Sequence, residues 1–396
     1  MSMHRFHLLL TASIVYMLFV CSLAFSEVPP GPIIRSFDRS LNLDTAPTTS
    51  ASASVGDLNS DGFLDIVLAR GRHWPESNQV LFGDGAGNFA GVALGPSPDR
   101  TYSAALADLN GDGSLDMVIS NDRPDQKRIY FNDGKGNFTE TGGFGEPEWP
   151  TRYVTLADLN ADGHPDIIAA NRNGAKSTNA TPSFVCFNDG SGRFPDYCPL
   201  PTQSSTTVAA ADFDGDGSID LFTPHRDGGP SKILWNDSQG RFNESSILGP
   251  KASRTRVAVA ADLNGDGVVD LVVGGDDGKG TLIYINQAKR QFGGASPLSA
   301  PDRVAFSAIV SDLNRDGTLD IVVGYDTGRS SVFFNDGSGH RFVETAWNDG
   351  VGAVYGLAVG DFNGDGWPDI VTARSEGLNA IWFSEPIKDE TLNASP

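Results

Sequence analysis

Basic residues are scarce in this sequence of 396 residues, which carries 29 Lys and Arg against 50 Asp and Glu and a formal net charge of −21. A protein that binds phosphate groups needs a basic face, so this balance argues against a nucleic-acid partner. It also argues against adsorption to anionic membranes. Helical periodicity is missing, and so are a Ser-His-Asp signature, a phosphate-binding glycine loop and a zinc motif. These absences favour an all-β chain and give catalysis little support.

Long apolar runs are also missing, except at the N-terminus, where Leu8–Phe25 is almost wholly apolar. Ala24 and Ser26 are small residues at the −3 and −1 positions, so the segment is typical of a signal peptide spanning residues 1–26 and cleaved before Glu27. An uncleaved membrane anchor is the alternative, because the run is nearly long enough to cross a bilayer. We expect a secreted protein, extracellular or periplasmic, that has no membrane span after cleavage.

Cysteine occurs three times. Cys21 lies in the expected signal peptide, which leaves Cys186 and Cys198 on either side of an expected hairpin. Export permits a disulfide between these two residues. Two buried free thiols fit the sequence equally well, so both alternatives stay open.

One nine-residue string, with the pattern Asp-x-Asn/Asp-x-Asp-Gly-x-x-Asp, recurs along the chain. Its copies begin at Asp57, Asp108, Asp158, Asp212, Asp262, Asp312 and Asp361, at intervals of 49 to 54 residues. A short run of small and apolar residues precedes each copy, and a β-rich run such as Asp270-Leu-Val-Val follows it. Turns such as Asn-Asp-Gly, followed by a Gly-x-Phe pattern as at Phe138, predict a hairpin of two further strands. Each repeat therefore has the length and pattern of a four-stranded propeller blade.

The two ends of the chain complement each other. The seventh repeat lacks a fourth strand, whereas the segment Ile33–Phe37 is a strand without a repeat, at the distance from Asp57 expected of a fourth strand. We therefore predict a seven-bladed β-propeller of four-stranded antiparallel blades, with its ring closed by the N-terminal strand. The propeller should cover residues 27–386, and residues 387–396 should form a tail. The fifth repeat has Ile285–Phe292 in place of the Asp-Gly turn, so we expect an irregular hairpin there.

Over residues 33–384 these repeats make the chain resemble the FG-GAP or VCBS repeat family, which includes the integrin α-subunit propeller. The resemblance implies a propeller with calcium in loops of this type. It does not imply a single function, because members of the family serve in adhesion, in sugar binding and as modules of carbohydrate-active enzymes.

The repeated string also matches the first half of an EF-hand loop. Calcium prefers six to eight oxygen ligands, and we expect them from the side chains at positions one, three, five and nine and the carbonyl at position seven. Glycine at position six lets the backbone turn around the ion. The predicted ligands are Asp57, Asn59, Asp61, Phe63, Asp65, Asp108, Asn110, Asp112, Ser114, Asp116, Asp158, Asn160, Asp162, His164, Asp166, Asp212, Asp214, Asp216, Ser218, Asp220, Asp262, Asn264, Asp266, Val268, Asp270, Asp312, Asn314, Asp316, Thr318, Asp320, Asp361, Asn363, Asp365, Trp367 and Asp369.

Up to seven structural Ca²⁺ ions follow from this pattern. These loops hold 22 carboxylates, so they account for the acidity of the chain, and seven Ca²⁺ would bring the net charge from −21 to −7. The alternative is that the Asp side chains only cap tight turns through backbone hydrogen bonds. That alternative explains one or two acids in a loop, but not three or four.

The loops on the opposite face are not repeated and are rich in arginine and aromatic residues. Guanidinium groups suit carboxylate or sulfate, and aromatic faces suit sugar rings. Five arginines follow the second strand of their repeats, and we predict that they form a ligand face: Arg70, Arg123, Arg172, Arg226 and Arg374. The alternative is that they pair with local acids such as Asp227 and Asp276.

Three functions fit this sequence. We favour a non-catalytic adhesion or recognition module with an extracellular glycan or protein ligand that is acidic. A lectin with shallow pockets between blades is the second. A carbohydrate-active enzyme such as a polysaccharide lyase is the third, with His73 and His225 as its possible acids or bases; one deep pocket that holds His, Tyr and Arg would favour it.

Overall fold

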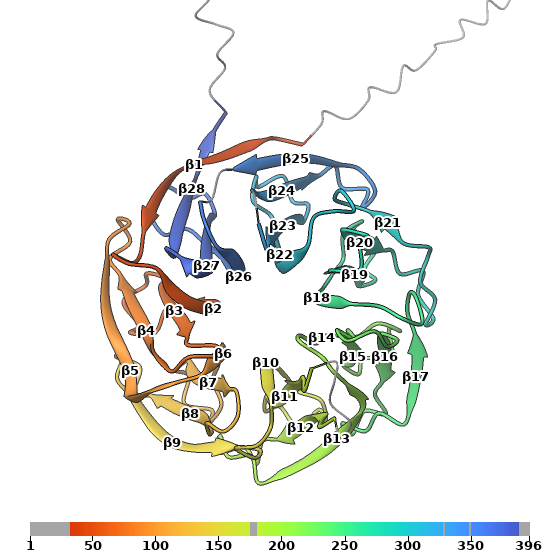
Figure 1. The fold of residues 1–396 in the computed structure, drawn as a ribbon, viewed down its shortest axis with the longest axis horizontal. Helices are drawn as coiled ribbons and strands as arrows, with labels where there is room; N and C mark the ends of the chain where they lie inside the picture. The colour runs from red at the N-terminus through yellow and green to blue at the C-terminus, as the bar shows by residue number, and fades with distance from the viewer. Residues whose placement is uncertain (1–31, 175–179, 328, 348–349, 388–396) are drawn as a thin grey trace, which may run out of the picture. The chain divides into compact units, whose positions relative to one another are not determined.

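A computed structural model describes residues 32–174, 180–327, 329–347 and 350–387, and Figure 1 shows how their strands are arranged. The predicted signal peptide and residues 388–396 of the predicted tail lie outside these ranges. Throughout the described ranges the regular structure is β-strand, so the all-β prediction is confirmed. No helix there is long and apolar enough to cross a membrane.

The strands form antiparallel sheets in sequence order, and five of these sheets in the described residues have four strands each. We call each four-stranded set a blade and name it by its first strand. These five are β6 Thr101–Ala107, β7 Asp116–Asn121, β8 Lys127–Asn132 and β9 Phe138–Phe144; β10 Thr151–Ala157, β11 Asp166–Asn171, β12 Pro182–Phe187 and β13 Asp196–Gln203; β14 Ala209–Ala211, β15 Asp220–Thr223, β16 Lys232–Trp235 and β17 Glu244–Ile247; β18 Thr255–Ala261, β19 Asp270–Gly275, β20 Thr281–Tyr284 and β21 Ser296–Pro297; β22 Ala305–Ser311, β23 Asp320–Tyr325, β24 Ser330–Asn335 and β25 Phe342–Trp347.

A further sheet of eight strands contains two such blades. The β2 blade consists of β2 Thr48–Gly56, β3 Asp65–Arg70, β4 Glu76–Gly83 and β5 Phe89–Asp99. The β26 blade consists of β26 Ala353–Gly360, β27 Asp369–Gly377, β28 Ala380–Pro386 and β1 Arg35–Asn42. A short pairing between the start of β2 and the end of β27 joins the two blades, with Thr48 opposite Gly377 and Thr49 opposite Ser375.

The N-terminal strand supplies the fourth strand of the β26 blade, as predicted from the incomplete last repeat. β1 pairs with β28 in antiparallel register from Arg35 opposite Pro386 to Asn42 opposite Ala380, so the strand starts and ends later than the predicted Ile33–Phe37. Phe37 is fully buried, with its ring 5.9 Å from that of Trp347. Burial of a phenylalanine ring contributes about 2 kcal/mol, so this strand is held by packing as well as by pairing.

The hydrophobic core lies between successive blades. One buried cluster, for example, joins Val118 and Ile129 of the β6 blade to Val154 and Ile167 of the β10 blade. The second strands are buried on both faces, since all six residues of β7, β11, β19 and β23 are buried. A four-stranded blade has apolar residues on both of its faces, and stacking covers both.

An asparagine at the end of the third strand, or just after it, also connects neighbouring blades. Its Nδ2 donates to the carbonyl oxygen of a buried residue in the loop of the preceding blade, at 2.7 to 2.9 Å. The five donors and their acceptors in the described residues are Asn132 to Leu58, Asn188 to Leu109, Asn236 to Leu159, Asn286 to Phe213 and Asn335 to Leu263. In the β26 blade Ser384 takes this place, and Arg35 of β1 donates to its Oγ at 3.0 Å.

The first strands of the blades lie innermost, around a common space (Figure 1). These inner strands are β2, β6, β10, β14, β18, β22 and β26. Each contacts the inner strand of the next blade, and β26 contacts β2. Residues at the start of the inner strands are therefore brought together from all parts of the sequence.

Candidate functional site

One residue near the start of each inner strand points into the common space. Pairing between the first two strands of a blade skips one residue, which makes a β-bulge. In the described residues the skipped positions are Ala51, Tyr102, Arg152, Arg256, Phe306 and Tyr355. Each lies six residues before the first Asp of its repeated string, and Thr206 has this place in the β14 blade. A bulge changes the direction of a side chain relative to the regular strand, and all seven residues line one cavity.

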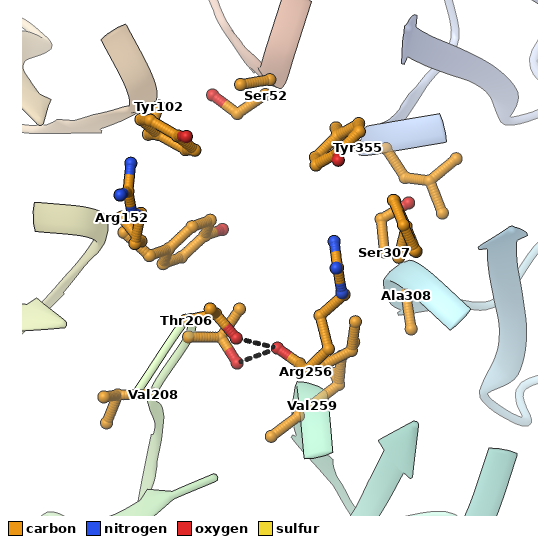
Figure 2. Close-up of a pocket in the computed structure, with 18 of the residues that line it drawn as sticks. Ser52, Tyr102, Arg152, Thr206, Val208, Arg256, Val259, Ser307, Ala308 and Tyr355 are labelled. Carbon is orange, nitrogen blue, oxygen red and sulfur yellow. Dashed lines mark hydrogen bonds between the residues drawn. The ribbon is translucent and has the colours of Figure 1, made fainter. Parts of the chain in front are cut away.

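This central pocket has a volume of about 590 Å³. Small residues of the inner strands, such as Ala53, Ala258 and Ala308, form much of its wall. Figure 2 shows Arg152 and Arg256 on opposite sides of the pocket, with Tyr102 beside the first and Tyr355 beside the second. The volume is in the range of small-molecule sites, so the pocket can admit a small ligand or the end of a larger one.

A tight turn after β3 adds two more side chains, Arg72 and His73, to the pocket. The turn starts at Gly71, whose φ is +111° and where a Cβ atom would lie 2.2 Å from the carbonyl oxygen of Asp99. Only glycine fits such a position. The amide of Arg72 donates to the carbonyl of Thr101 at 3.0 Å, which anchors the turn to the neighbouring blade.

Arginine and aromatic side chains stack around the pocket. The guanidinium of Arg152 lies 4.3 Å from the ring centre of Tyr102, and that of Arg256 lies 3.6 Å from Phe306. The guanidinium of Arg72 lies 3.8 Å from the ring of Tyr355, and Arg256 is 5.8 Å from this same ring. Cation–π contacts hold the guanidinium planes in place.

The pocket arginines differ in how their charge is balanced. Arg152 pairs with Asp122 at 2.6 Å, and Arg172, which also lines the pocket, pairs with Asp227 at 2.6 Å. Arg72 and Arg256 form no ion pair with any of the residues described. Within the part of the chain that the structure describes, positive charge without a counter-ion is therefore concentrated near Tyr355.

Arg72 and Arg256, which have no acidic partner in the described structure, also have hydrogen-bond donors that are not used. The Nε atoms of Arg72 and Arg256 are buried and make no hydrogen bond in the described structure. Burial, and then the positive charge of Arg226, lowers the pKa of Arg256. Arg72 donates through Nη2 to the Tyr355 hydroxyl at 2.8 Å and through Nη1 to Ser375. An anion in the pocket would supply the missing counter-charge.

His73 and Tyr102 contact each other at the edge of the pocket, with the phenol oxygen 3.1 Å from Nδ1 of the imidazole. Desolvation lowers the pKa of His73, and the charges of Arg72 and Arg152 lower it further. The imidazole is therefore neutral near pH 7 and able to accept a proton. His225, the other predicted histidine, is not among the pocket residues; its Nδ1 accepts a hydrogen bond from the amide of Gly229 at 2.9 Å.

The structure does not bring the five predicted ligand-face arginines together. Arg70 forms an ion pair with Asp44, Arg226 forms one with Asp276 at 2.7 Å, and Arg374 is 1% exposed. Arg123 is exposed, and among these five Arg172 alone is a pocket residue. Binding by this set stays a prediction, while Arg72, Arg152 and Arg256 have the more favourable position. Arg152 and Arg256 can be located in the sequence, because each is the variable residue six positions before a repeated string.

The predicted metal loops are the nine residues of each string, and their carboxylates are organised by backbone amides. In the first loop Asp57 accepts from the amides of Asp61 and Gly62 at 3.2 and 3.0 Å. Asp65, at position nine, is fully buried and accepts from the amides of Leu58 at 2.8 Å and Gly83 at 2.9 Å. The other position-nine residues make the same two contacts: Asp116, Asp166, Asp220, Asp270, Asp320 and Asp369.

The oxygen-rich donor set of these loops fits a hard cation such as calcium. In the fourth loop Asp212, Asp214 and Asp216 each bring a carboxylate oxygen within 4.8 Å of the others. Burial also raises the pKa of the position-nine carboxyls, to about 7 for Asp220 and Asp320. Carboxylates that are costly to ionise when buried gain most from a bound cation.

The hairpin of the fifth repeat differs from the hairpins of the other repeats, and one of its residues contacts the fourth loop. Its hairpin has three successive residues with positive φ, Ala288, Lys289 and Arg290, in agreement with the predicted irregularity. Arg290 donates to Asp214 at 2.7 Å and to Glu244 at 2.8 Å. Asp214 replaces the Asn of the other loops, so the additional acid has an arginine from the neighbouring blade as its partner.

The two remaining cysteines are free in the structure. Cys186 is buried in β12 and Cys198 is partly buried in β13. Of the two alternatives left by the sequence, the structure therefore has the free thiols. Burial raises the pKa of Cys186 to about 12, so this thiol is unreactive at neutral pH.

Several known proteins are similar to parts of this chain. A T-cell immunomodulatory protein homolog of Plasmodium yoelii yoelii is 26% identical over 220 residues, which are 47% of this chain and 30% of that protein. Cartilage acidic protein 1 of Xenopus tropicalis is 31% identical over 167 residues, or 37% of this chain and 25% of that protein. The matches thus span less than a third of the length of these curated relatives.

Solved structures share the fold. A lectin of Agrocybe aegerita that recognises non-reducing terminal N-acetylglucosamine has a TM-score of 0.54 at 22% identity, over 76% of this chain and 81% of the lectin. BBS1N, solved in complex with ARL6DN, has a TM-score of 0.59 at 11% identity, over 91% of this chain and all of that one. The FG-GAP-like repeat matches six overlapping segments: 57–119, 108–169, 158–223, 212–273, 262–323 and 312–372. Together these segments cover most of the chain, which therefore belongs to the FG-GAP repeat family.

Proposed function

We propose that this protein is a secreted, non-catalytic recognition module, a seven-bladed propeller whose central pocket binds an acidic extracellular ligand. Contacts between successive inner strands, including β26 with β2, support a closed ring. The pairing of β1 with β28 supports closure by the N-terminal strand. Secretion rests on the predicted signal peptide, and the ligand is an acidic glycan or an acidic protein surface.

Calcium would be held by the metal loops, through the side chains at positions one, three, five and nine and the carbonyl at position seven. In the first loop Asn59 directs Nδ2 to Asp61 at 2.9 Å, and turning its amide over would direct Oδ1 to the ion instead. The bound ion supplies positive charge among converging carboxylates. The loops in turn fix the inner and second strands of each blade, so calcium has a structural role away from the pocket residues.

The observation that carries the recognition function is the set of guanidinium groups and aromatic rings at the bulged positions and in the turn after β3. Arg72 and Arg256 have no acidic partner in the described structure, which favours an anionic ligand. The rings of Tyr102, Phe306 and Tyr355 offer flat surfaces beside these charges. A pocket built from the ends of several blades gives many weak contacts at once.

Isothermal titration calorimetry tests this function. We expect acidic oligosaccharides or acidic peptides to bind, with an affinity that falls as salt rises from 0.05 to 0.5 M, because salt screens ionic contacts. Arg256→Gln should weaken binding, whereas Arg193→Gln, a matched change on the turn between β12 and β13, should not. Equal binding by both variants, or no binding of any acidic ligand, would reject the proposal.

The central pocket holds His, Tyr and Arg together, which is the feature expected of a carbohydrate-active enzyme. This composition and the contact between His73 and Tyr102 favour a second candidate, a lyase that acts on acidic polysaccharides. A neutral imidazole could take the proton next to a uronic-acid carboxylate as the C4–O bond breaks. The leaving oxygen would receive a proton from the phenol, and a C4–C5 double bond would form. Ultraviolet absorbance of the unsaturated product measures this reaction. Activity that His73→Ala abolishes would establish the lyase, and binding without product would exclude it for the polymers assayed.

A further inference from the structure

The side of the central pocket next to Tyr355 holds two guanidinium groups and, among the residues that the structure describes, no acid. Arg72 and Arg256 approach the same ring, at 3.8 and 5.8 Å from its centre. Tyr355 accepts a hydrogen bond from Arg72, so its own O–H stays available to donate. Two like charges beside the same ring raise the free energy of the empty pocket, and a ligand oxyanion would lower it.

The opposite side of the pocket is less positive because Asp122 neutralises Arg152. Tyr102 and Tyr153 line this side, and Tyr153 is 37% exposed. The pocket thus has two different sides. Unbalanced positive charge lies near Tyr355, and the rings of Tyr102 and Tyr153 lie on the opposite side. A sugar ring that carries one oxyanion has the same division, with charge at one edge and C–H faces on the ring.

An exposed tryptophan lies next to the pocket in the sequence. Trp74 follows His73 directly and is 73% exposed, although its amide is fixed by a hydrogen bond to the carbonyl of Gly71 at 2.6 Å. The same turn therefore directs Arg72 and His73 into the pocket and leaves an indole in solvent. A large apolar ring held on a rigid turn is a typical contact for a second ligand group outside the pocket.

The size of the bulged residue explains why this turn enters the pocket. The β2 blade has Ala51 where the β6 and β26 blades on either side have Tyr102 and Tyr355. The small side chain leaves room that Arg72 and His73 fill, each next to one of these tyrosines. Two residues of this turn, Arg72 and His73, therefore line the central pocket.

We propose that the central pocket binds the oxyanion-bearing terminal sugar of an acidic oligosaccharide, with Arg72, Arg256 and Tyr355 on the oxyanion and Trp74 against the next sugar. This inference rests on the proposed function and names its ligand. A pocket of about 590 Å³ encloses a terminal sugar with its substituents but no folded protein surface. The oxyanion is a carboxylate or a sulfate, both of which a guanidinium binds through two parallel hydrogen bonds.

Calorimetry with five probes tests the inference: galacturonic acid, trigalacturonic acid, a sulfated trisaccharide, neutral maltotriose and a hexaglutamate peptide. We expect an acidic trisaccharide to bind, maltotriose to bind at least tenfold more weakly, and the peptide to bind no better than maltotriose. The stronger of the carboxylated and sulfated probes identifies the oxyanion. Each variant is checked by circular dichroism and thermal melting, so that a misfolded protein is not scored.

Four variants assign the contacts. Arg256→Gln should weaken acidic-trisaccharide binding about 10- to 100-fold, the loss expected for a charged hydrogen bond, while Arg193→Gln leaves it unchanged. Arg256→Lys retains the charge but lacks the planar guanidinium fork. Its affinity for the acidic trisaccharide should therefore lie between those of Arg256→Gln and Arg193→Gln. Trp74→Ala should weaken the trisaccharide at least fivefold and leave galacturonic acid unchanged. Equal loss for both sugars would remove Trp74 from the site.

The outcomes separate this inference from the function on which it rests. Peptide binding that depends on Arg256, without binding of any acidic sugar, would overturn the oligosaccharide ligand and leave acidic recognition standing. Failure of all acidic probes would overturn both. Acidic-sugar binding that is indifferent to Arg256→Gln would overturn the central pocket as its site.

Discussion

Removal of calcium should destabilise this protein far more at pH 8 than at pH 5. The reason is the buried aspartate at position nine of each metal loop. Asp166, Asp220, Asp320 and Asp369 are at most 1% exposed. Burial raises their pKa in the metal-free fold, to about 7 for Asp220 and Asp320 and about 6 for the other two.

The sign of the effect follows from these directions. In an unfolded chain an aspartate has a pKa of about 4, so above that value the unfolded state loses its proton before the folded state does. Folding stability without metal therefore falls as pH rises from about 4 to 7 and levels off above. A shift of about 3 units corresponds to about 4 kcal/mol, and one of about 2 units to about 3 kcal/mol. Over the four residues the penalty is on the order of 10 kcal/mol, which matches the whole stability of a typical domain.

Thermal melting with and without a chelator at pH 5, 6.5 and 8 measures this effect, with metal loss verified by elemental analysis. We expect the chelated protein to melt at a lower temperature as the pH rises, and the calcium-loaded protein to change little. Asp320→Asn, which has no charge to bury, should reduce the pH dependence of the chelated protein. A chelated protein with the same melting temperature at pH 5 and pH 8 would refute the reasoning.

Three further changes test other parts of the structure. Deleting residues 27–42 removes β1, exposes an edge of β28 and should lead to aggregation that light scattering detects; a deletion variant as soluble as the parent would reject closure by this strand. Asn236→Ala leaves the carbonyls of Leu159 and Ile219 without their donor and should lower the free energy of unfolding by about 1–3 kcal/mol, measured in urea. Arg290→Gln removes the cation that Asp214 contacts and should raise calcium affinity by calorimetry, while Arg193→Gln should leave it unchanged.

The strands of the blades could be predicted from the sequence because every repeat shows the same pattern of residues. The string that begins at Asp57 fixes a loop, the strand after it and the buried aspartate on which that strand starts. The placement of β1 was also predictable, since the last repeat lacked one strand and Phe37 had the spacing of the missing one. Repetition makes such features easier to predict, because a repeat that departs from the pattern can be compared with the other repeats.

The pocket was harder to predict because its residues do not repeat. Arg172 and Arg226 follow their second strands in the sequence, but their partners Asp227 and Asp276 come from the next blade. Which arginine keeps its charge unpaired depends on contacts about fifty residues apart, and the pattern of one repeat does not contain them. The sequence showed that arginines were abundant on this face, whereas the bulge that directs Arg256 inward is a property of strand pairing.

The same architecture separates stability from recognition within each blade. The aspartate at position nine is uniform among the repeats, because its two backbone contacts join the loop to the third strand. The residue six positions before each string lines the pocket and not the loop, so Ala51, Tyr102 and Arg256 can occupy equivalent places. Substitutions at the bulge should therefore change the ligand without unfolding the blade. This freedom lets the residue at the bulge differ from blade to blade, and it makes that residue the one to change when the proposed site is tested.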